Sequence, residues 1–463
     1  MAASADLSAE SDSDRTAPAS KEEREVESGN DVPFSVDLAA VGDNAAAERI
    51  ASHATSIPPA PAPVPDGGLE AWLQVLGSWV VLVDTWGLIN CFGVYQTFYE
   101  TDFLSSRSSS DISWIGSLQA ALLMVIGVVS GPLYDAGYFR ELLMVGLFLI
   151  VFGQFMTSLC TTYTQVLLAQ GVCIGIGMGL TFLPSAAILS QYFQKRRALV
   201  LGLSSTGSPL AGIIFPIIFS RLQPIIGFGW ATRIIGFILL GISVIPLAFM
   251  HTRVPPNKKR NLFDETAFKD ISFLFIAAAT FFAFLTLYVA FFYITLFANK
   301  HGVWTPEMAP YLVTLLNAGS VFGRVLPSMI ADKWGALNML ITCLIGSAVL
   351  ALGWFGIHGL AGLIVFALLY GLFSGGVVSL VPTVLVSSSP DMGRVGARMG
   401  IAFVMAGLAL LVGTPICGAI LGDFAEQKWL GAIGYTAGSL VLSCILFVTA
   451  RVLKFRENGS RRM

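Results

Sequence analysis

The sequence predicts an all-helical membrane protein with twelve transmembrane helices in two halves of six. Long apolar runs recur along the chain, basic residues gather in alternate breaks, and similar motifs appear in both halves. Of the 463 residues, 55% are hydrophobic and 12% are charged. A soluble chain carries about 25% charged residues. The net charge of −2 gives no reason to expect a nucleic-acid partner.

The first 65 residues are rich in Ala, Ser, Glu, Asp and Pro and poor in aromatic residues. Such a segment buries too little apolar surface to offset the entropy lost on ordering, so we expect a disordered cytoplasmic tail over 1–65. It lacks the basic stretch followed by an apolar stretch that marks a cleaved signal peptide.

The first predicted span runs from Trp72 to Phe98 and contains a single charge, Asp84, near its middle. About 20 apolar residues suffice to cross a bilayer as a helix. The twelve expected spans lie near 72–98, 112–133, 141–160, 164–189, 198–219, 231–250, 271–297, 309–330, 336–356, 360–386, 399–421 and 430–452. They form an N-terminal half over 66–250 and a C-terminal half over 271–452, joined by a polar cytoplasmic loop over 251–270 and followed by a cytoplasmic tail over 453–463.

Lys and Arg are distributed unequally between the two sides. With the N-terminus in the cytoplasm, the inside loops and the C-terminal tail hold seventeen of them and the outside loops hold four. Positive residues favour the cytoplasmic side, so both termini are expected there.

Two motif pairs indicate an internal duplication. Gly207–Gly212 (GSPLAG) resembles Gly413–Gly418 (GTPICG) at a shift of 206 residues, and Asp135–Gly137 resembles Asp332–Gly335 at a shift of 197. Similar shifts favour two related halves. The alternative is that glycine-rich membrane helices look alike in any case.

Three motifs carry a resemblance to a known family. Gly131–Arg140 (GPLYDAGYFR) resembles the loop 2–3 signature of the major facilitator superfamily. Asp66–Trp72 and Tyr192–Leu199, followed by Gly202, resemble two signatures of its monocarboxylate transporter family, and the long N-terminus is similar to the fungal monocarboxylate-permease-like branch. The resemblance covers Asp66 to about Lys454 and implies the major facilitator fold.

The sequence also departs from this family. Loop 2–3 is one residue short between Asp135 and Gly137, and span one has Gln96 near the place where animal lactate carriers have a functional lysine. Arg324 is similar to the arginine that meets the substrate carboxylate in those carriers. Ser320 stands one turn before it where they have an aspartate, and Gln170 stands where many proton-coupled members of the superfamily have an arginine. Proton symport of the lactate type is therefore in doubt.

Asp84 and Arg324 are the two charged site candidates. A carboxylate at mid-membrane costs roughly 2.5–3.5 kcal/mol on insertion scales, so Asp84 would favour its neutral form and either carry a proton or bond to a neighbouring helix. Arg324 would bind an anionic solute with its planar fork. Its alternatives are snorkelling to the interface or pairing with Asp332.

Other residues are candidates by type and position. Polar residues within spans would line a cavity or join helices: Asn90, Gln96, Gln119, Gln170, Tyr288 and Asn317. Loop charges would close the cytoplasmic side: Asp135, Arg140, Asp332 and Lys333. Close helix contact and helix bending are expected at Gly171, Gly175, Gly179, Pro209 and Pro415.

These features favour a secondary or facilitative carrier of a small organic anion that works by alternating access, with protons as a candidate co-substrate. The chain lacks a G-x-x-x-x-G-K-[ST] motif, a nucleophile–base set and metal-ligand spacing, so we expect no enzyme, cofactor or metal. The alternatives are transport of a bulkier solute, such as a secondary metabolite or riboflavin, and a non-transporting receptor. The plasma membrane is the expected location and an endomembrane the alternative, while transport direction and oligomeric state stay open.

Overall fold

The computed structural model describes residues 65–194, 196–253, 265–305, 308–388, 395–422 and 426–458. Residues 1–64 of the predicted tail, residues 254–264 of the predicted inter-half loop and the last five residues lie outside this part of the chain.

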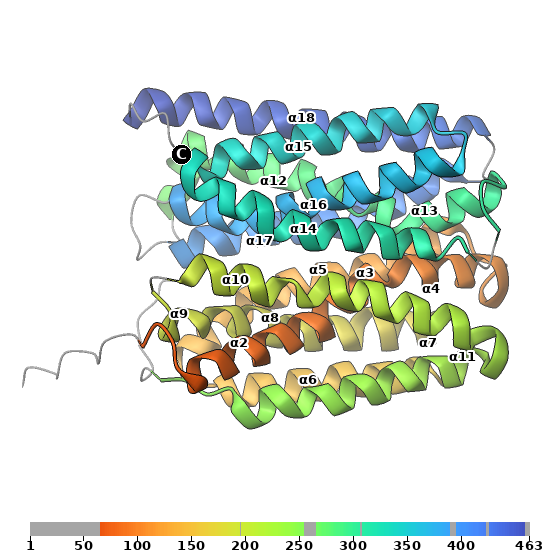
Figure 1. The fold of residues 1–463 in the computed structure, drawn as a ribbon, viewed down its shortest axis with the longest axis horizontal. Coiled ribbons are helices and arrows are strands. Elements are labelled where there is room, and N and C mark those ends of the chain that lie inside the picture. The colour runs from red at the N-terminus through yellow and green to blue at the C-terminus, as the bar shows by residue number, and fades with distance from the viewer. Residues whose placement is uncertain are drawn as a thin grey trace, which may run out of the picture. The chain divides into compact units, whose positions relative to one another are not determined.

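Eleven helical segments of the described chain are long and apolar enough to cross a membrane. One of them, Leu199–Phe249, is 51 residues long and holds two crossings, because Gly227 interrupts it with φ 78° and ψ 166°. Positive φ is cheap only for glycine, so the chain can reverse direction at this residue. Figure 1 shows the two arms of this segment joined by a turn at one end of the bundle and running back from it in opposite directions along the chain. The all-helical fold with twelve crossings predicted from the sequence is therefore confirmed.

The first six crossings, which we call the N half, contain α2 (Leu69–Leu82), η2 (Val83–Gly87), α3 (Leu88–Asn90), α4 (Phe92–Phe98), η3 (Tyr99–Phe103), α5 (Ser109–Asp135), α6 (Phe139–Thr157), α7 (Tyr163–Val166), η4 (Leu167–Ile174), α8 (Gly175–Ala187), α9 (Leu189–Tyr192), α10 (Arg197–Ser205) and α11 (Gly207–Phe249). The elements η2, η3 and η4 are π-helical turns.

The last six crossings, the C half, contain α12 (Ile271–Leu287), α13 (Val289–Lys300), α14 (Tyr311–Trp334), α15 (Ala336–Gly353), α16 (Leu360–Ser388), α17 (Val395–Leu421) and α18 (Glu426–Asn458). The short 3-10 turn η5 (Glu265–Lys269) precedes them, and η6 (Trp354–Gly356) follows α15. The beginning of α2 and the end of α18 lie at one end of the bundle, which we call the terminal end (Figure 1). The opposite end, with the turn at 104–108, is the distal end.

Local sequence explains where several helices begin. Ser108 accepts a hydrogen bond from the Asp111 backbone and Asp111 returns one, and Thr162 and Gln165 form the same capping box before α7. These boxes satisfy backbone N–H groups that have no partner inside the helix.

The repeated loop motifs share a backbone feature. Gly137 follows α5 with φ 98°, and Gly335 follows α14 with φ 94°. A residue with a Cβ is strained in this region, so a glycine is the natural end of both motifs.

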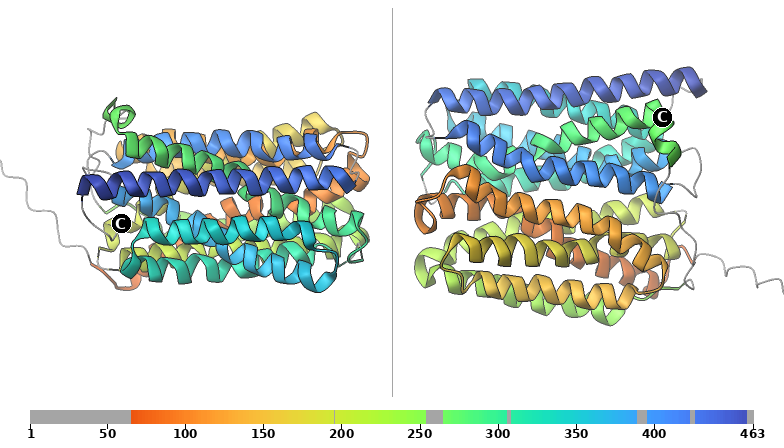
Figure 2. Two further views of the ribbon diagram at one scale, coloured as in Figure 1. Left: turned by 90° about the horizontal axis from the view of Figure 1, so that it is seen from above. Right: turned by 180° about the vertical axis from the view of Figure 1, so that it is seen from behind.

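Contacts within each half and between the halves define the bundle. In the N half, α8 packs against α5 and α6, and α11 packs against α2 and α6; in the C half, α16 packs against α14 and α15, and α18 against α12 and α15. Contact between the halves is made by α5 with α17, α11 and α10 with α14, and α4 with α13. The helices run side by side in all the views of Figures 1 and 2.

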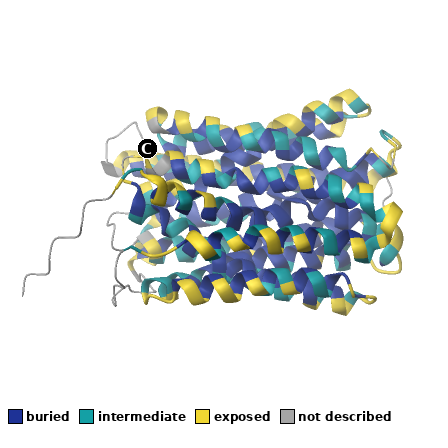
Figure 3. Ribbon diagram, turned by 60° about the horizontal axis from the view of Figure 1, so that its bottom comes forward, coloured by how far each residue is buried: buried dark blue, intermediate teal, exposed yellow. Residues whose placement is uncertain are grey.

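Large apolar side chains cover both the inside and the outside of the bundle. Phe148, Phe237, Ile345 and Val349 are at least half exposed along their helices. Buried residues fill the centre in Figure 3, with exposed ones on the outward faces. Exposed apolar helix faces of this length fit contact with lipid chains.

Spans one and seven are both broken at mid-length. Cys91 separates α3 from α4 with φ −89° and ψ −4°, and Tyr288 separates α12 from α13 with φ −87° and ψ −4°. The two residues are 197 positions apart, which is the shift between the loop motifs. Irregular backbone in a span is tolerated where it borders protein or a cavity.

Candidate functional site

A small cavity lies between the two halves at the level of these breaks. Its lining comes from Asn90 of the N half and, in the C half, from Leu287, Tyr288, Phe291, Ser320, Arg324, Ser374, Gly375 and Val378. Of the residues predicted to line a cavity, the structure thus brings together Asn90, Tyr288 and Arg324.

The Arg324 guanidinium is the charged group of this cavity. The residue is 3% exposed, and its Nη1 donates to the Ser205 carbonyl oxygen at 3.2 Å and its Nη2 to Ser208 Oγ at 3.3 Å. Its Nε has no hydrogen-bond partner among the described residues. A buried arginine is normally paired with an acid, whereas both acceptors here are neutral. The site therefore has unused capacity for an anion.

Ser208 links the Arg324 side chain of the C half to the Asn90 side chain of the N half. Its hydroxyl also accepts from Asn90 Nδ2 at 3.0 Å. Ser208 follows Gly207 at the start of α11, where a Cβ on Gly207 would lie 2.4 Å from the Trp79 carbonyl oxygen. The close packing of α11 on span one thus fixes Ser208 beside Asn90.

In the C half, close packing of α14 against α16 at two glycines holds Arg324 in place. A Cβ on Gly323 would lie 2.0 Å from the Leu372 carbonyl oxygen, and one on Gly375 would lie 2.7 Å from Ser320 Oγ. Such approaches exclude any larger side chain, so the two backbones pack directly.

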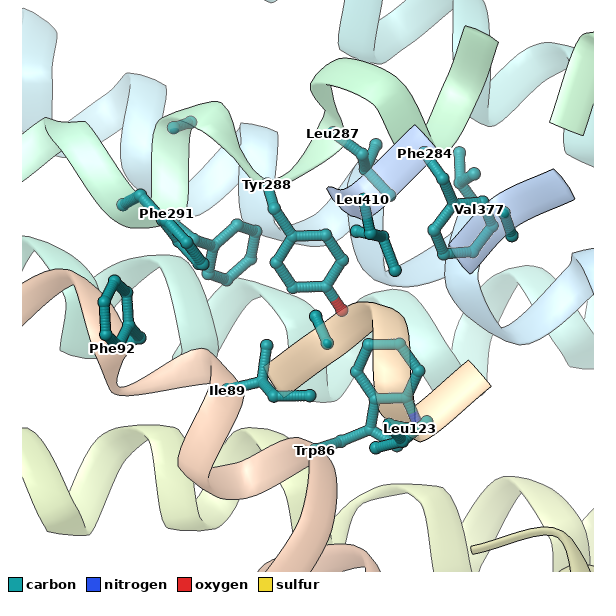
Figure 4. Close-up of a cluster of buried hydrophobic side chains, with 14 of the residues drawn as sticks. Trp86, Ile89, Phe92, Leu123, Phe284, Leu287, Tyr288, Phe291, Val377 and Leu410 are labelled. Atoms are coloured by element: carbon teal, nitrogen blue, oxygen red, sulfur yellow. The ribbon is translucent and has the colours of Figure 1, made fainter. Parts of the chain in front are cut away.

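Aromatic rings form a wall beside the cavity, and two of them, Tyr288 and Phe291, border it directly. Trp86 of η2 and Tyr288 stack across the two halves with ring centroids 5.9 Å apart and planes inclined by 23°. Phe182 meets Trp86 edge-on at 5.9 Å, and Phe291 lies 5.4 Å from Tyr288. Figure 4 shows the Tyr288 ring extending from the C half toward Trp86. The wall offers flat surfaces on which another ring could stack.

Asp84 lies within the N half and outside this cavity. It is fully buried, and its Oδ2 accepts from Ser243 Oγ of α11 at 3.0 Å, while its Oδ1 has no partner among the described residues. The contact joins η2 to α11 within one half. This geometry fits the packing alternative better than the proton alternative.

Gln96 lies near the distal end and away from Arg324. Its Nε2 donates to Glu100 Oε1 and to Ser113 Oγ, the latter at 3.1 Å. Glu100 was not among the residues predicted for a site. It follows the end of the first apolar run and is close to other charged residues, as a loop residue would be.

The remaining polar candidates serve contacts between helices. Gln119 donates to Met178 Sδ at 3.5 Å, and Gln170 accepts from Tyr99 OH at 2.7 Å. Asn317 donates to the Val313 carbonyl oxygen at 2.9 Å and packs on Gly212 of α11, where a Cβ would lie 2.3 Å from its Oδ1.

The loop charges lie at the terminal end. Asp135 is half-buried, whereas Arg140 and Lys333 are exposed. The Asp332 side chain lies outside the described part of the structure, so its predicted role in closing this end stays a prediction.

The predicted glycine face of span four meets α5. A Cβ on Gly171 would lie 3.2 Å from the Ile115 carbonyl oxygen, one on Gly175 3.0 Å from Leu122 Cβ, and one on Gly179 2.5 Å from Ile126 Cβ. Pro209 is buried in the first turn of α11, and Pro415 lies inside α17, where its carbonyl oxygen accepts from Ser110 Oγ at 2.9 Å.

Two signature motifs meet at the terminal end. The Asp66 N–H donates to the Tyr192 carbonyl oxygen at 3.0 Å, and the Gln194 N–H donates to Asp66 Oδ1 at 2.6 Å. Trp72 and Phe193 pack edge-on with centroids 5.6 Å apart. The motifs therefore form one structural contact at the terminal end, and neither contributes a residue to the lining of the Arg324 cavity.

Comparison with known proteins places the chain among transporters. It matches the family model of the Major Facilitator Superfamily over residues 75–324 and 276–462. The MFS-type transporter dbaD of Emericella nidulans is 46% identical over 79% of this chain and 82% of its own length.

Two further relatives are named as efflux proteins. The aspyridones efflux protein apdF of Emericella nidulans is 39% identical over 86% of this chain and 81% of its own length. An agnestins efflux protein of Paecilomyces divaricatus is 36% identical over 83% and 88%. With this family match and the twelve-span fold, the chain belongs to the major facilitator superfamily and is a multi-pass membrane transporter, not an enzyme.

Proposed function

We propose that the protein exports a secondary metabolite that combines an acidic group with a ring system. This is the bulkier-solute alternative drawn from the sequence, with an acidic group added. Relatives named as aspyridones and agnestins efflux proteins support export of such products over uptake of a small monocarboxylate.

The evidence for an acidic group on the substrate is the hydrogen bonding of Arg324. Its guanidinium is buried beside a cavity, donates to two neutral oxygens and keeps Nε without a partner among the described residues. An anionic oxygen would supply the missing acceptor and the missing charge together. Hydrogen bonds to charged groups contribute about 1.5–3 kcal/mol each.

The ring system follows from the stack of Trp86 on Tyr288. These rings come from opposite halves, so a movement of the halves would open a slot between them. A flat ligand that enters this slot would replace the stack with two ring contacts, each contributing about 0.5–1.5 kcal/mol. Its acidic group would then reach Arg324, since Tyr288 and Arg324 border the same cavity.

Orientation and direction are part of the proposal. The bias of Lys and Arg favours a cytoplasmic terminal end, and export would carry the solute to the distal side, across the plasma membrane. The two halves, 66–250 and 271–452, would rock about the cavity as the moving bodies. The cavity is too small for a metabolite in this closed state, so loading requires the halves to part.

A small monocarboxylate is the second candidate substrate. Arg324 would serve its carboxylate equally well, and the motifs in Asp66–Trp72 and Tyr192–Leu199 resemble those of monocarboxylate transporters. The two candidates differ in whether the Trp86 and Tyr288 rings contribute to binding.

Uptake into proteoliposomes separates these substrates. The probes are radiolabelled 2-naphthoate, its neutral isostere 2-naphthamide, and lactate. We expect transport of 2-naphthoate in preference to both others. In Arg324→Gln the affinity for 2-naphthoate should fall by roughly 10- to 100-fold, the value of one lost charge-assisted contact.

Arg233→Gln is the matched control. Arg233 also lies in a span, but its Nε donates to Ser158 Oγ at 3.1 Å and its guanidinium lies over Trp230, away from the cavity. Full 2-naphthoate affinity in Arg324→Gln would contradict the anion site. Equal transport of lactate and 2-naphthoate would favour the monocarboxylate.

A further inference from the structure

A chain of hydrogen-bonded polar side chains, all buried except for the half-buried Glu100, crosses between the halves near the distal end. It begins at Glu100 of η3, whose Oε1 accepts from Ser109 Oγ at 2.7 Å and from Gln96 Nε2. Gln96 is fully buried and also donates to Ser113 Oγ at 3.1 Å. These residues belong to α4, η3 and α5 of the N half.

The same chain continues into the C half. The Ser113 hydroxyl is hydrogen-bonded to the Tyr293 hydroxyl of α13, and the Tyr293 hydroxyl donates to the Thr414 carbonyl oxygen of α17 at 3.2 Å. The Thr414 hydroxyl is in turn hydrogen-bonded to Ser117 of α5. Parting of the halves at this end would break these bonds.

The acceptor capacity of the chain is only partly used. Glu100 Oε2 and Gln96 Oε1 are both buried without a hydrogen-bond partner among the described residues. A carboxylate oxygen without a donor loses its hydration and gains nothing in return. A proton on Oε2 removes this charge and turns the oxygen into a donor.

Close packing surrounds the part of this chain that lies between α5 and α17. A Cβ on Gly418 of α17 would lie 2.7 Å from Tyr293 OH and 2.8 Å from Ser110 Cα. Next to it, Ser110 Oγ donates to the Pro415 carbonyl oxygen at 2.9 Å. Separation of α5 from α17 would admit water to Glu100.

Among the described residues, the other titratable groups around Glu100 come from α13, α17 and α5. Lys300 of α13 acts electrostatically on the Glu100 carboxylate, and this carboxylate in turn acts on Tyr293 of α13 and Cys417 of α17. On α5, Asp111 accepts from the Ser108 N–H at 3.3 Å. From α11 the apolar Phe228 packs on η3. Among these groups, Lys300 is the basic side chain and Asp111 the acidic one.

We propose that Glu100 binds a proton from the distal side and that the protonated form holds the distal ends of the two halves together. Loss of the proton leaves a charge that is poorly accommodated in the closed state and well hydrated in the open one. Rising pH therefore shifts the population toward separated distal ends. The inference is independent of which solute the protein carries.

Distances between spin labels test this without any solute. The labels are attached to Arg107→Cys in the N half and Lys428→Cys in the C half, both exposed at the distal end, in the full-length protein with its six native cysteines replaced. The protein is held in lipid nanodiscs at pH 5.5 and pH 8. We expect the ratio of separated to closed populations to rise with pH, by at most about tenfold per unit for one proton.

Two variants test whether Glu100 causes the pH response. Glu100→Gln keeps an acceptor for Ser109 and Gln96 but carries no titratable proton, so its populations should be the same at both pH values. Asp102→Asn removes an exposed acid two residues away and should keep the wild-type response. A wild type without pH response, an unchanged response in Glu100→Gln, or a lost response in Asp102→Asn would each overturn the proposal.

Discussion

At the scale of single residues, two charged side chains that are buried within spans, Arg324 and Asp84, have different surroundings. Arg324 borders a cavity between the halves, whereas Asp84 lies inside the N half against Ser243. Burial of a charged side chain is costly in either place. Of these two residues, Arg324 is the one positioned so that a solute could offset this cost, and we therefore propose a binding role for Arg324 and a packing role for Asp84.

Substitution of Asp84 tests this division. Asp84→Asn keeps an acceptor for the Ser243 hydroxyl, so we expect near wild-type melting and an unchanged pH dependence of 2-naphthoate transport. Asp84→Ala removes the acceptor and should lower stability by about 0.6 kcal/mol, and at most about 1.7 kcal/mol, the range for hydrogen bonds between membrane helices. Thermal unfolding in detergent and transport at two pH values measure both. Loss of pH dependence in Asp84→Asn would restore Asp84 as the proton carrier.

At the scale of elements, the sequence predicted the spans and missed their irregularities. Apolar runs long enough to cross a bilayer define twelve segments whatever their packing. The π-helical turns η2, η3 and η4 and the breaks at Cys91 and Tyr288 depend on neighbouring helices, and no local residue pattern announces them.

The candidate site was predictable in part for the same reason. Arg324 stands out because a charge within a span is rare. Ser208 and Glu100 carry no such signal: serine is common in spans, and Glu100 looks like part of a loop. Their roles arise from contacts with Asn90 and Ser109, which are distant along the chain or fixed only by the fold.

The junction of α12 with α17 shows a helix cap with a second function. Asp270 accepts from the Phe273 N–H at 3.0 Å and pairs with Arg398 of α17, whose Nη1 lies 2.6 Å from Asp270 Oδ2. Burial raises the pKa of Asp270, but the hydrogen bonds from Arg398 and Phe273 and the charges of Arg398 and Lys454 outweigh it and lower the pKa below its usual value. The Arg398 side chain is 2% exposed.

A pH-dependent stability follows from this pair. Because the folded pKa is lowered, the stabilisation is complete above the unfolded value of about 3.9 and is lost as the pH falls from there toward the folded value. Asp270→Asn should therefore cost about 1–3 kcal/mol at pH 7, since it removes the carboxylate that pairs with Arg398. The difference from wild type should shrink below about pH 4. Thermal unfolding at pH 7 and pH 3.5 measures it, with the exposed Glu141→Gln as control. An equal difference at both pH values would contradict the ion-pair account.

At the scale of the whole molecule, the halves meet along α5 and α17, along α11 and α14, and along α4 and α13. Small residues allow these contacts: a Cβ on Gly93 would lie 2.1 Å from the Phe291 carbonyl oxygen, and one on Gly212 of α11 2.3 Å from Asn317 Oδ1 of α14. The Arg324 cavity lies between these seams. A solute can enter and leave only if the seams open, so transport requires movement of one half against the other.

A reversible disulfide between the two halves tests the requirement for this movement most directly. The Ser117 and Thr414 hydroxyls are hydrogen-bonded across α5 and α17, which brings their β-carbons within the reach of a disulfide. The measurement is counterflow of 2-naphthoate in proteoliposomes by Ser117→Cys/Thr414→Cys, in a background without the six native cysteines. We predict counterflow in the reduced protein, its loss on oxidation and its recovery after reduction, while either single-cysteine variant stays active throughout. Undiminished counterflow by the fully cross-linked protein would contradict alternating access between the two halves.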